Sequence, residues 1–246
     1  MTNLCNSIKN NTNNSVEEEK KLLFDKTVTC PVCNNTFKSK AVKVNAPRID
    51  KKDSDFFTIY KTINPYFYDV WICNDCGYSA LKIDFDNIKG KQIDFILKNI
   101  TPKWNKKNYP DTYDVYIALD RYKLALITSS IIMKKSSTKG MICLKIAWMY
   151  RIIDEKTLED SFLEKALYAF KDAYLNETLP VYGMQKPNIL YVIGELHRRL
   201  GNFDTSIKNF SLVLIDETAS HRLKELTRDM RDLIKEVREK ETNLLG

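Results

Sequence analysis

The spacing of apolar and polar residues changes about a third of the way along the chain. Between residues 28 and 81 the apolar residues recur with the short period of β-strands. Residues 37–44 alternate in this way, and residues 66–72 are rich in β-branched and aromatic side chains. The dipeptide Asn64-Pro65 predicts a turn before the second run. We therefore expect strands over residues 37–44 and 66–72.

Beyond residue 86 the apolar residues recur with the period of an α-helix, and prolines and glycines interrupt the pattern. Gly140 and Gly201 are expected to end helices. The last helix is expected to cap the others, with a short coiled coil as the alternative. The pattern predicts an antiparallel array of helices over residues 93–100, 113–127, 141–153, 157–176, 187–200, 203–214 and 223–237.

Residues 187–218 fit one tetratricopeptide repeat, a pair of stacked helices. Gly194 occupies the small-residue position of the first helix, and Phe210 the large aromatic position of the second. His197 departs from the motif, which usually has tyrosine there. A weaker echo upstream comprises Ala166, Phe170 and Ala173. We expect tetratricopeptide-like stacking, with a simple helical bundle as the alternative.

Four of the six cysteines form two pairs with the same internal spacing, Cys-x-x-Cys. They are Cys30, Cys33, Cys73 and Cys76. A gap of two residues lets both sulfurs of a pair face one ion, and two pairs complete a tetrahedron. The residue after each pair must take a positive φ, which Gly77 adopts freely and Asn34 tolerates. Four thiolates close the coordination shell, so we expect structural Zn²⁺, with iron in a rubredoxin-like site as the alternative.

Composition divides the chain into three expected parts of an α+β protein. Residues 1–16 are dominated by Asn, Ser and Thr and are expected to be disordered. Residues 17–86 are expected to form a small zinc-ribbon-like β module, and residues 87–246 an antiparallel, tetratricopeptide-like helical domain. Cys5 lies in the polar tail, and Cys143 is expected to be a small buried apolar residue.

The formal net charge of +7 is concentrated in the first half of the chain. Residues 17–110 contain 17 basic and 12 acidic residues, a mild bias that is weaker than the basic face of a dedicated nucleic-acid binder. No stretch reaches the ~18 apolar residues of a membrane span, and the N-terminus lacks the apolar core of a signal peptide. We therefore expect a cytoplasmic protein, with reduced thiols and no membrane partner.

Common catalytic motifs are missing from the sequence. The only histidines, His197 and His221, are too far apart for a His-Glu-x-x-His zinc motif, and there is no Gly-x-Ser-x-Gly elbow. The glycines are too widely spaced for a phosphate-binding loop or a dinucleotide fingerprint. We expect no catalysis, with an enzyme of unfamiliar site as the alternative. Asp50, Asp53 and Asp55 are expected to be solvated loop carboxylates rather than a cation site.

Seven aromatic residues lie within residues 56–71. They are Phe56, Phe57, Tyr60, Tyr66, Phe67, Tyr68 and Trp71. We expect them to form a small core around the metal. Alternatively, they could stack on unpaired bases while Lys40, Lys43 and Arg48 contact phosphates. Lysines around Trp104 make a second basic patch in an expected solvated loop, Thr101–Pro110.

The order of these features resembles a bacterial family catalogued as domain of unknown function 2225. The resemblance is carried by the stretches Asp25-Lys-Thr-Val-Thr-Cys-Pro-Val-Cys33, Asp53-Ser-Asp-Phe56, Ile63-Asn-Pro-Tyr66 and Tyr68-Asp-Val-Trp-Ile-Cys-Asn-Asp-Cys-Gly-Tyr78. It is close over residues 22–82 and looser through the helices to about residue 218. The resemblance implies a zinc-binding N-terminal region joined to tetratricopeptide-like helices, and it implies no reaction.

These features together predict a non-enzymatic, zinc-binding adaptor or scaffold whose helices bind a protein or peptide partner. The alternative is a nucleic-acid-binding regulator that uses the aromatic and basic zinc ribbon. That alternative predicts an affinity that falls steeply with salt. The sequence pattern carries no prediction of oligomeric state.

Overall fold

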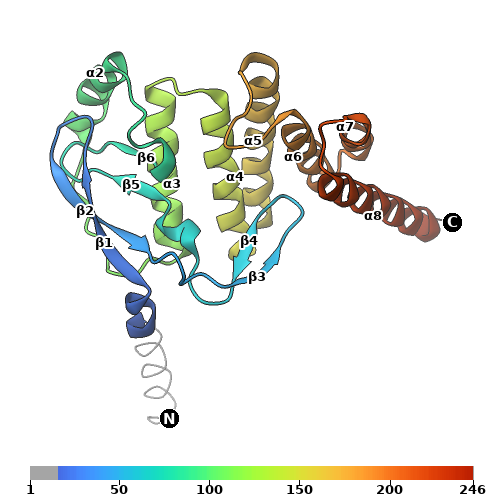
Figure 1. Ribbon diagram of the computed structural model, residues 1–246, viewed down its shortest axis with the longest axis horizontal. Helices are drawn as coiled ribbons and strands as arrows, with labels where there is room; N and C mark the ends of the chain where they lie inside the picture. The colour runs from blue at the N-terminus through green and yellow to red at the C-terminus, as the bar shows by residue number, and fades with distance from the viewer. Residues whose placement is uncertain (1–15, 246) are drawn as a thin grey trace, which may run out of the picture. The chain divides into compact units, whose positions relative to one another are not determined.

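The computed structural model describes residues 16–245 and has the α+β class that the sequence predicts (Figure 1). The expected disorder of residues 1–16 lies outside the described residues, except for Val16. The strands are β1 (Leu23–Thr29), β2 (Thr36–Val42), β3 (Ile49–Lys52), β4 (Thr58–Tyr60), β5 (Val70–Ile72) and β6 (Ser79–Leu81). The α-helices are α2 (Gly90–Asn99), α3 (Val115–Ile131), α4 (Ser136–Ile152), α5 (Lys156–Asn176), α6 (Lys186–Arg199), α7 (Phe203–Ile215) and α8 (His221–Leu245).

The six strands form three separate antiparallel hairpins, β1-β2, β3-β4 and β5-β6. The prediction of a strand over residues 37–44 is confirmed by β2. The prediction over residues 66–72 is wrong in its first half, because Pro65–Tyr68 is a 3-10 helix, η1. Asn64 caps this turn by accepting a hydrogen bond from the backbone N–H of Tyr66, and Pro65 suits its first position.

Gly140 lies inside α4, so the prediction that it separates two helices is wrong. The break falls earlier, where Met133 has a φ of +49°. A methyl group on Gly140 would lie 3.2 Å from the Cβ of Ala169 and 3.3 Å from the ring of Phe170. The glycine therefore serves close packing of α4 against α5.

Contacts divide the chain into two units. Unit 1 comprises Met1–Lys52 and Thr58–Lys134, and unit 2 comprises Asp53–Phe57 and Lys135–Gly246. The short segment Asp53–Phe57 thus belongs to the helical unit, although both strands beside it belong to unit 1. The domains expected from composition divide the chain at other positions, and their boundaries stay a prediction.

In unit 1, α3 packs against the β5-β6 hairpin (Figure 1). Two side chains of α3 bind backbone carbonyls around that hairpin: Arg121 donates to the oxygen of Val70 and Tyr122 to that of Tyr66. These contacts explain why α3 belongs with the strands rather than with the later helices.

In unit 2, helices pack as the pairs α4–α5 and α6–α7, and α8 packs against both α6 and α7. Gly194 of α6 faces Phe210 of α7 so closely that a methyl group on it would lie 2.8 Å from the ring. Leu223 and Ile234 of α8 join the same buried cluster. Among the described residues, no helix is both long and apolar enough to cross a membrane.

Candidate metal centre

Two hairpin loops of unit 1 hold the four predicted ligands. Cys30 and Cys33 lie in the loop between β1 and β2, and Cys73 and Cys76 lie in the loop between β5 and β6. Each cysteine pair therefore follows directly on a strand, β1 or β5. The pairing of that strand with the next one, β2 or β6, fixes both ends of the loop. Because the two hairpins are far apart in sequence, the site forms only when unit 1 folds.

The two loops have the same backbone hydrogen bonds. The N–H of Asn34 donates to the oxygen of Cys30, and the N–H of Gly77 donates to the oxygen of Cys73, at 2.9 and 2.8 Å. Asn34 has a φ of +60° and Gly77 a φ of +77°. The prediction of positive φ after each pair is confirmed, and this turn points both sulfurs of a pair in one direction.

The four sulfur atoms all lie within 4.8 Å of one another and could hold a metal ion. Two of the separations are 3.6 Å, between Cys30 and Cys76, and 3.5 Å, between Cys33 and Cys73. A tetrahedral ion with bonds near 2.3 Å would place its sulfurs about 3.8 Å apart. A disulfide would need about 2 Å. The spacing therefore fits ligands of one ion.

The sulfur cluster is part of a buried apolar core. Cys30, Cys73 and Cys76 are buried, and Cys33 is partly exposed. The surrounding side chains come from the strands, the two cysteine loops, the segment after β6, α2 and the residue after α3. They include Val28, Val32, Trp71, Tyr78, Ala80, Phe85, Ile96 and Ile132. An ion here would join segments that are distant in sequence, as a structural metal does.

Protons shared among the sulfur atoms govern their titration in the absence of a metal. Hydrogen bonds with Cys30 and then Cys76 hold the pKa of Cys73 far below its ordinary value. The thiols of Cys30 and Cys76 donate in these contacts, so the pKa of each is raised, and burial raises both further. A bound cation would displace these protons and favour the thiolate at every ligand.

Residues 101–110 cover the second loop, and the expectation that they form a solvated loop is correct for the exposed Lys103 and Lys106 and wrong for the half-buried Trp104. Trp104 donates from Nε1 to the oxygen of Asn74 at 2.9 Å, and its ring lies against Gly77. The hydroxyl of Thr101 donates to the oxygen of Cys76 at 2.9 Å. The sequence does not reveal this contact of Trp104 with the second loop, because the lysines on both sides of the tryptophan favour a solvent-exposed segment.

The seven clustered aromatic residues do not form one core around the metal. Trp71 does pack in the sulfur cluster, whereas Tyr68 stacks on Tyr113 in a different part of unit 1. Phe56 and Phe57 belong to unit 2, where the ring of Phe57 stacks on that of Trp148. The expected small core is therefore correct for Trp71 and wrong for these others.

The expectation of solvated carboxylates is wrong for Asp53 and Asp55. Arg151 donates to both, at 2.8 Å to Asp53 and 2.7 Å to Asp55, whose side chain is fully buried. Burial opposes ionisation of Asp53, but Arg199 and Arg151 outweigh it, and the pKa of this carboxyl is lowered. Asp50 is exposed and pairs with Lys61. Both carboxylates, the buried Asp55 and the partly exposed Asp53, are occupied by arginines and so are not a cation site.

Of the two remaining cysteines, the structure describes Cys143, which is not part of the sulfur cluster. Cys143 is buried in α4, as the sequence predicts, and burial raises the pKa of its thiol to about 11. Cys5 lies outside the described residues.

The fold and the site define an α+β protein with a four-cysteine site that could hold a metal ion. A family model described as an uncharacterized protein conserved in bacteria (DUF2225) matches residues 23–234. The chain belongs to this family, so the resemblance seen in the cysteine motifs is confirmed and reaches into α8. None of the curated proteins and none of the solved structures compared with the chain matches it.

Proposed function

We propose that this protein is a non-enzymatic, zinc-binding adaptor whose helical unit binds a protein or peptide partner. Zinc suits the sulfur cluster because it prefers tetrahedral thiolate coordination and has no redox chemistry of its own. Four thiolates leave no position for a reacting water, which favours a structural role. The proposal includes the cytoplasm as the compartment, because reduced thiols are available there.

The observation that carries the partner-binding role is a pocket of about 310 Å³ within unit 2. Its apolar lining includes Phe203, Leu233 and Val237. Its charged lining residues are Arg151, Arg198, Arg199, Lys156 and Glu159. Aromatic residues and arginines are the types enriched at protein interfaces.

The arginines of this pocket retain donors for a partner. Arg198 donates from Nε and Nη2 to Glu195, and Arg199 donates from the same two atoms to Glu195 and Asp53. Among the residues whose side chains the structure describes, 16–240, the Nη1 atoms of both have no hydrogen-bond acceptor. Such donors suit a carboxylate, and the apolar lining suits an aliphatic or aromatic side chain. The favoured partner segment is therefore apolar and acidic.

The packing of α6 on α7 supports a tetratricopeptide-like array as the scaffold for this pocket. Gly194 and Phe210 occupy the positions where that motif needs a small and a large side chain, and they are in direct contact. Ser206, another small-residue position, is fully buried. In repeats of this kind, stacked helix pairs present a surface for peptides.

The nucleic-acid alternative has less support from the described side chains. Base stacking needs exposed aromatic faces. Phe57, Tyr68 and Trp71, three of the seven clustered aromatics, are buried. This burial favours the adaptor over the alternative.

The adaptor is tested by affinity capture from the lysate of its own cells, with and without nuclease. Leu233→Glu places a charge in the apolar lining of the pocket, and Leu175→Glu is the matched control on α5. The expected result is a protein bound at about one per chain that survives nuclease, is lost with Leu233→Glu and persists with Leu175→Glu. Loss of the captured protein on nuclease treatment would contradict the adaptor and favour the nucleic-acid-binding alternative. A partner retained by both variants would remove the pocket from the proposal.

The metal is tested separately by elemental analysis of protein purified without added metal. The expected result is about one zinc per chain. Iron in its place, with the visible absorption of an iron–thiolate centre, would contradict the zinc assignment.

A further inference from the structure

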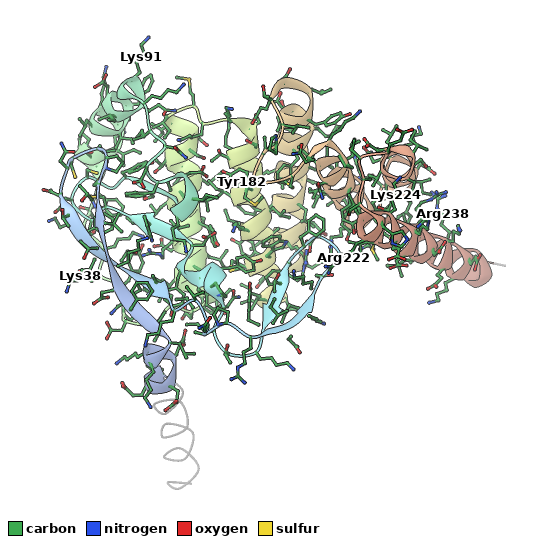
Figure 2. The ribbon with its side chains drawn as sticks, in the orientation of Figure 1. Lys38, Lys91, Tyr182, Arg222, Lys224 and Arg238 are labelled. Carbon is green, nitrogen blue, oxygen red and sulfur yellow. The ribbon has the colours of Figure 1, made fainter. Side chains whose placement is uncertain are left out.

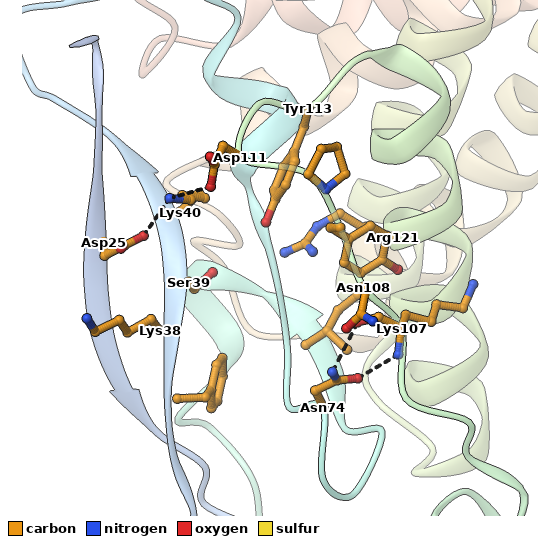
Figure 3. A pocket seen from close by; sticks show the side chains of 14 residues that line it. Asp25, Lys38, Ser39, Lys40, Asn74, Lys107, Asn108, Asp111, Tyr113 and Arg121 are labelled. Carbon is orange, nitrogen blue, oxygen red and sulfur yellow. Dashed lines mark hydrogen bonds and ion pairs between the residues drawn. The ribbon is translucent and has the colours of Figure 1, made fainter. Parts of the chain in front are cut away.

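A second pocket, of about 450 Å³, lies wholly within unit 1 (Figure 3). One wall is β2, with Ser39, and another is the loop that carries Asn74, next to the ligand Cys73. Asn74 fixes the segment opposite by exchanging two hydrogen bonds with the backbone of Lys107, at 3.0 and 2.8 Å. The pocket therefore has walls built by hydrogen bonds, and its inner end is formed by Arg121 of α3.

Arg121 is buried, with only 4% of its surface exposed, and Figure 3 shows its guanidinium pointing from α3 toward β2. Nη2 donates to the oxygen of Val70 at 2.5 Å. The buried Nε has no acceptor, and none is found for Nη1 within residues 16–240. The rings of Tyr109 and Tyr113 lie 4.8 and 4.6 Å from its Cζ. These rings support the cation but accept none of its protons strongly.

Three partly buried arginines of unit 2 differ from Arg121 in having carboxylate partners. In unit 2, Arg151, Arg198 and Arg199 each pair with at least one carboxylate at 2.7–2.8 Å. Arg121 is more buried than these three but has no carboxylate within ion-pair distance in the described chain. Its neighbour Asp120 is occupied by Lys107 and the hydroxyl of Tyr109.

A buried guanidinium without an anion is costly, because removal from water is not offset by an opposite charge. Burial accordingly lowers the pKa of Arg121. An anion that entered the pocket would remove this penalty and satisfy the open donors. The charge and the open donors around Arg121 therefore suit an anionic ligand.

Other donors of the pocket are also open. The hydroxyl of Ser39 and the amide of Asn108 line it, and neither has a hydrogen-bond partner within the part of the chain described. The two acidic residues of the lining, Asp25 and Asp111, both pair with Lys40 (Figure 3). Asp111 also pairs with Lys20 at 3.7 Å, so two lysines balance the two acids, and the groups without a partner are donors.

We propose that this pocket binds a small molecule that carries an oxyanion, a phosphate ester or a carboxylate, with two of its oxygens on the guanidinium of Arg121. Ser39 and Asn108 donate to the same group, and Lys38, whose ammonium points across β1 away from Arg121 (Figure 3), adds long-range attraction. A guanidinium presents parallel N–H donors that match a pair of oxyanion oxygens. The proposal is independent of the partner-binding role of unit 2.

The test titrates intact, metal-loaded protein with inorganic phosphate and, separately, with acetate, against chloride at the same ionic strength. Binding is followed by the NMR resonance of the Nε–H of Arg121, identified by its loss in Arg121→Lys, and by calorimetry. Lys38→Met removes a nearby cation without touching the buried core. Lys91→Met on α2 is the matched control, and Figure 2 shows Lys91 and Lys38 at separate places on the surface.

The expected result is a saturable shift of the Arg121 resonance with phosphate or acetate and none with chloride. A larger effect of phosphate identifies a phosphate ester, and a larger effect of acetate a carboxylate. Arg121→Lys should weaken binding about tenfold or more, because a lysine cannot hold two oxygens at once. Lys38→Met should weaken it about threefold, and Lys91→Met should not change it.

Three results would overturn the proposal. The first is an Arg121 resonance that responds equally to all three anions, and the second is equal weakening by Lys38→Met and Lys91→Met. The third is binding of a single-stranded oligonucleotide with no response to the small anions, which would assign the pocket to a nucleic-acid backbone. Should Arg121→Lys fail to fold, Lys38→Met and the wild-type titration still decide.

Discussion

The carboxylate of Asp55 accepts a hydrogen bond of 2.9 Å from the indole Nε1 of Trp148, 93 residues further along the chain. The same carboxylate accepts from Arg151 at 2.7 Å, and the ring of Phe57 stacks on that of Trp148. A loop of five residues thereby supplies unit 2 with both a charge and an aromatic side chain. The helical unit is complete only when this loop is in place.

Replacing Asp55 by Asn should destabilise the protein by about 1–3 kcal/mol, because Arg151 loses one buried counter-charge and keeps Asp53 and Glu159. Urea unfolding followed by tryptophan fluorescence measures the loss. Asp50→Asn is the matched control: Asp50 is exposed and pairs only with Lys61, so its loss should cost about 0–1 kcal/mol. Equal effects of the two variants would show that the charge of Asp55 does not hold the segment Asp53–Phe57 in unit 2.

Replacing Cys73 by Ser should release the metal and unfold the part of unit 1 around the sulfur cluster, while the helices of unit 2 persist. Three remaining thiolates cannot close the shell, and metal binding is coupled to folding in such modules. Elemental analysis should fall from about one ion per chain to near zero.

The readout of folding is limited proteolysis together with circular dichroism. Cys143→Ser changes a buried cysteine outside the cluster and should retain the metal. An unchanged pattern of N-terminal cleavage in Cys73→Ser would refute a structural role for the ion.

A methyl group on Gly194 should force α6 and α7 apart, because it would lie 2.8 Å from the ring of Phe210. Gly194→Ala should cost about 1–3 kcal/mol, measured as a lower midpoint of thermal unfolding. Gly90→Ala is the control, since a methyl group there meets nothing within 4 Å. The second change Phe210→Leu should recover part of the loss. Failure of this rescue would mean that the Gly194 contact does not set the helix spacing.

His197 should make the protein less stable in mild acid. Burial, and to a lesser degree Lys171, lowers the pKa of this imidazole below its ordinary 6.5, and neither ring nitrogen has a partner in the described structure. The folded state therefore keeps it neutral, while the unfolded chain protonates it. The free energy of unfolding is therefore unaffected by this group above pH 6.5. It decreases as the pH falls below that value, by at most about 1.4 kcal/mol per pH unit.

Chemical unfolding at a series of pH values between 7.5 and about 5 tests this sign. His197→Leu should flatten the dependence, and His221→Leu, at an exposed position of α8, should leave it unchanged. A dependence that survives in His197→Leu would assign it to other groups.

The features that sequence alone could predict are those set by local spacing. The Cys-x-x-Cys pairs fix their own turns, which is why both positive φ angles, at Asn34 and Gly77, could be predicted. The helical stripes likewise predicted α5, α6 and α7 closely. The role of Gly140 could not be predicted, because a single sequence does not distinguish a glycine that ends a helix from a glycine at which two helices pack closely.

Other features depend on partners that are distant in sequence. Strand β1 has buried side chains only at Leu23 and Val28, so it shows no alternation to detect. The loop of Asp53 and Asp55 is polar in sequence and becomes buried only through arginines far along the chain. Arg121 shows the same limit, since nothing beside it in the sequence indicates that it is buried without a carboxylate.

The chain passes between the two units three times, after Lys52, Phe57 and Lys134. Synthesis on the ribosome proceeds from the N-terminus, so Asp55 emerges well before Trp148 and Arg151 exist. The nascent hairpin must then keep an acidic loop in water until α4 has been made. A fragment that starts at residue 135 would carry every helix of unit 2 and still leave Arg151 without Asp53 and Asp55. No single truncation point therefore yields either unit complete.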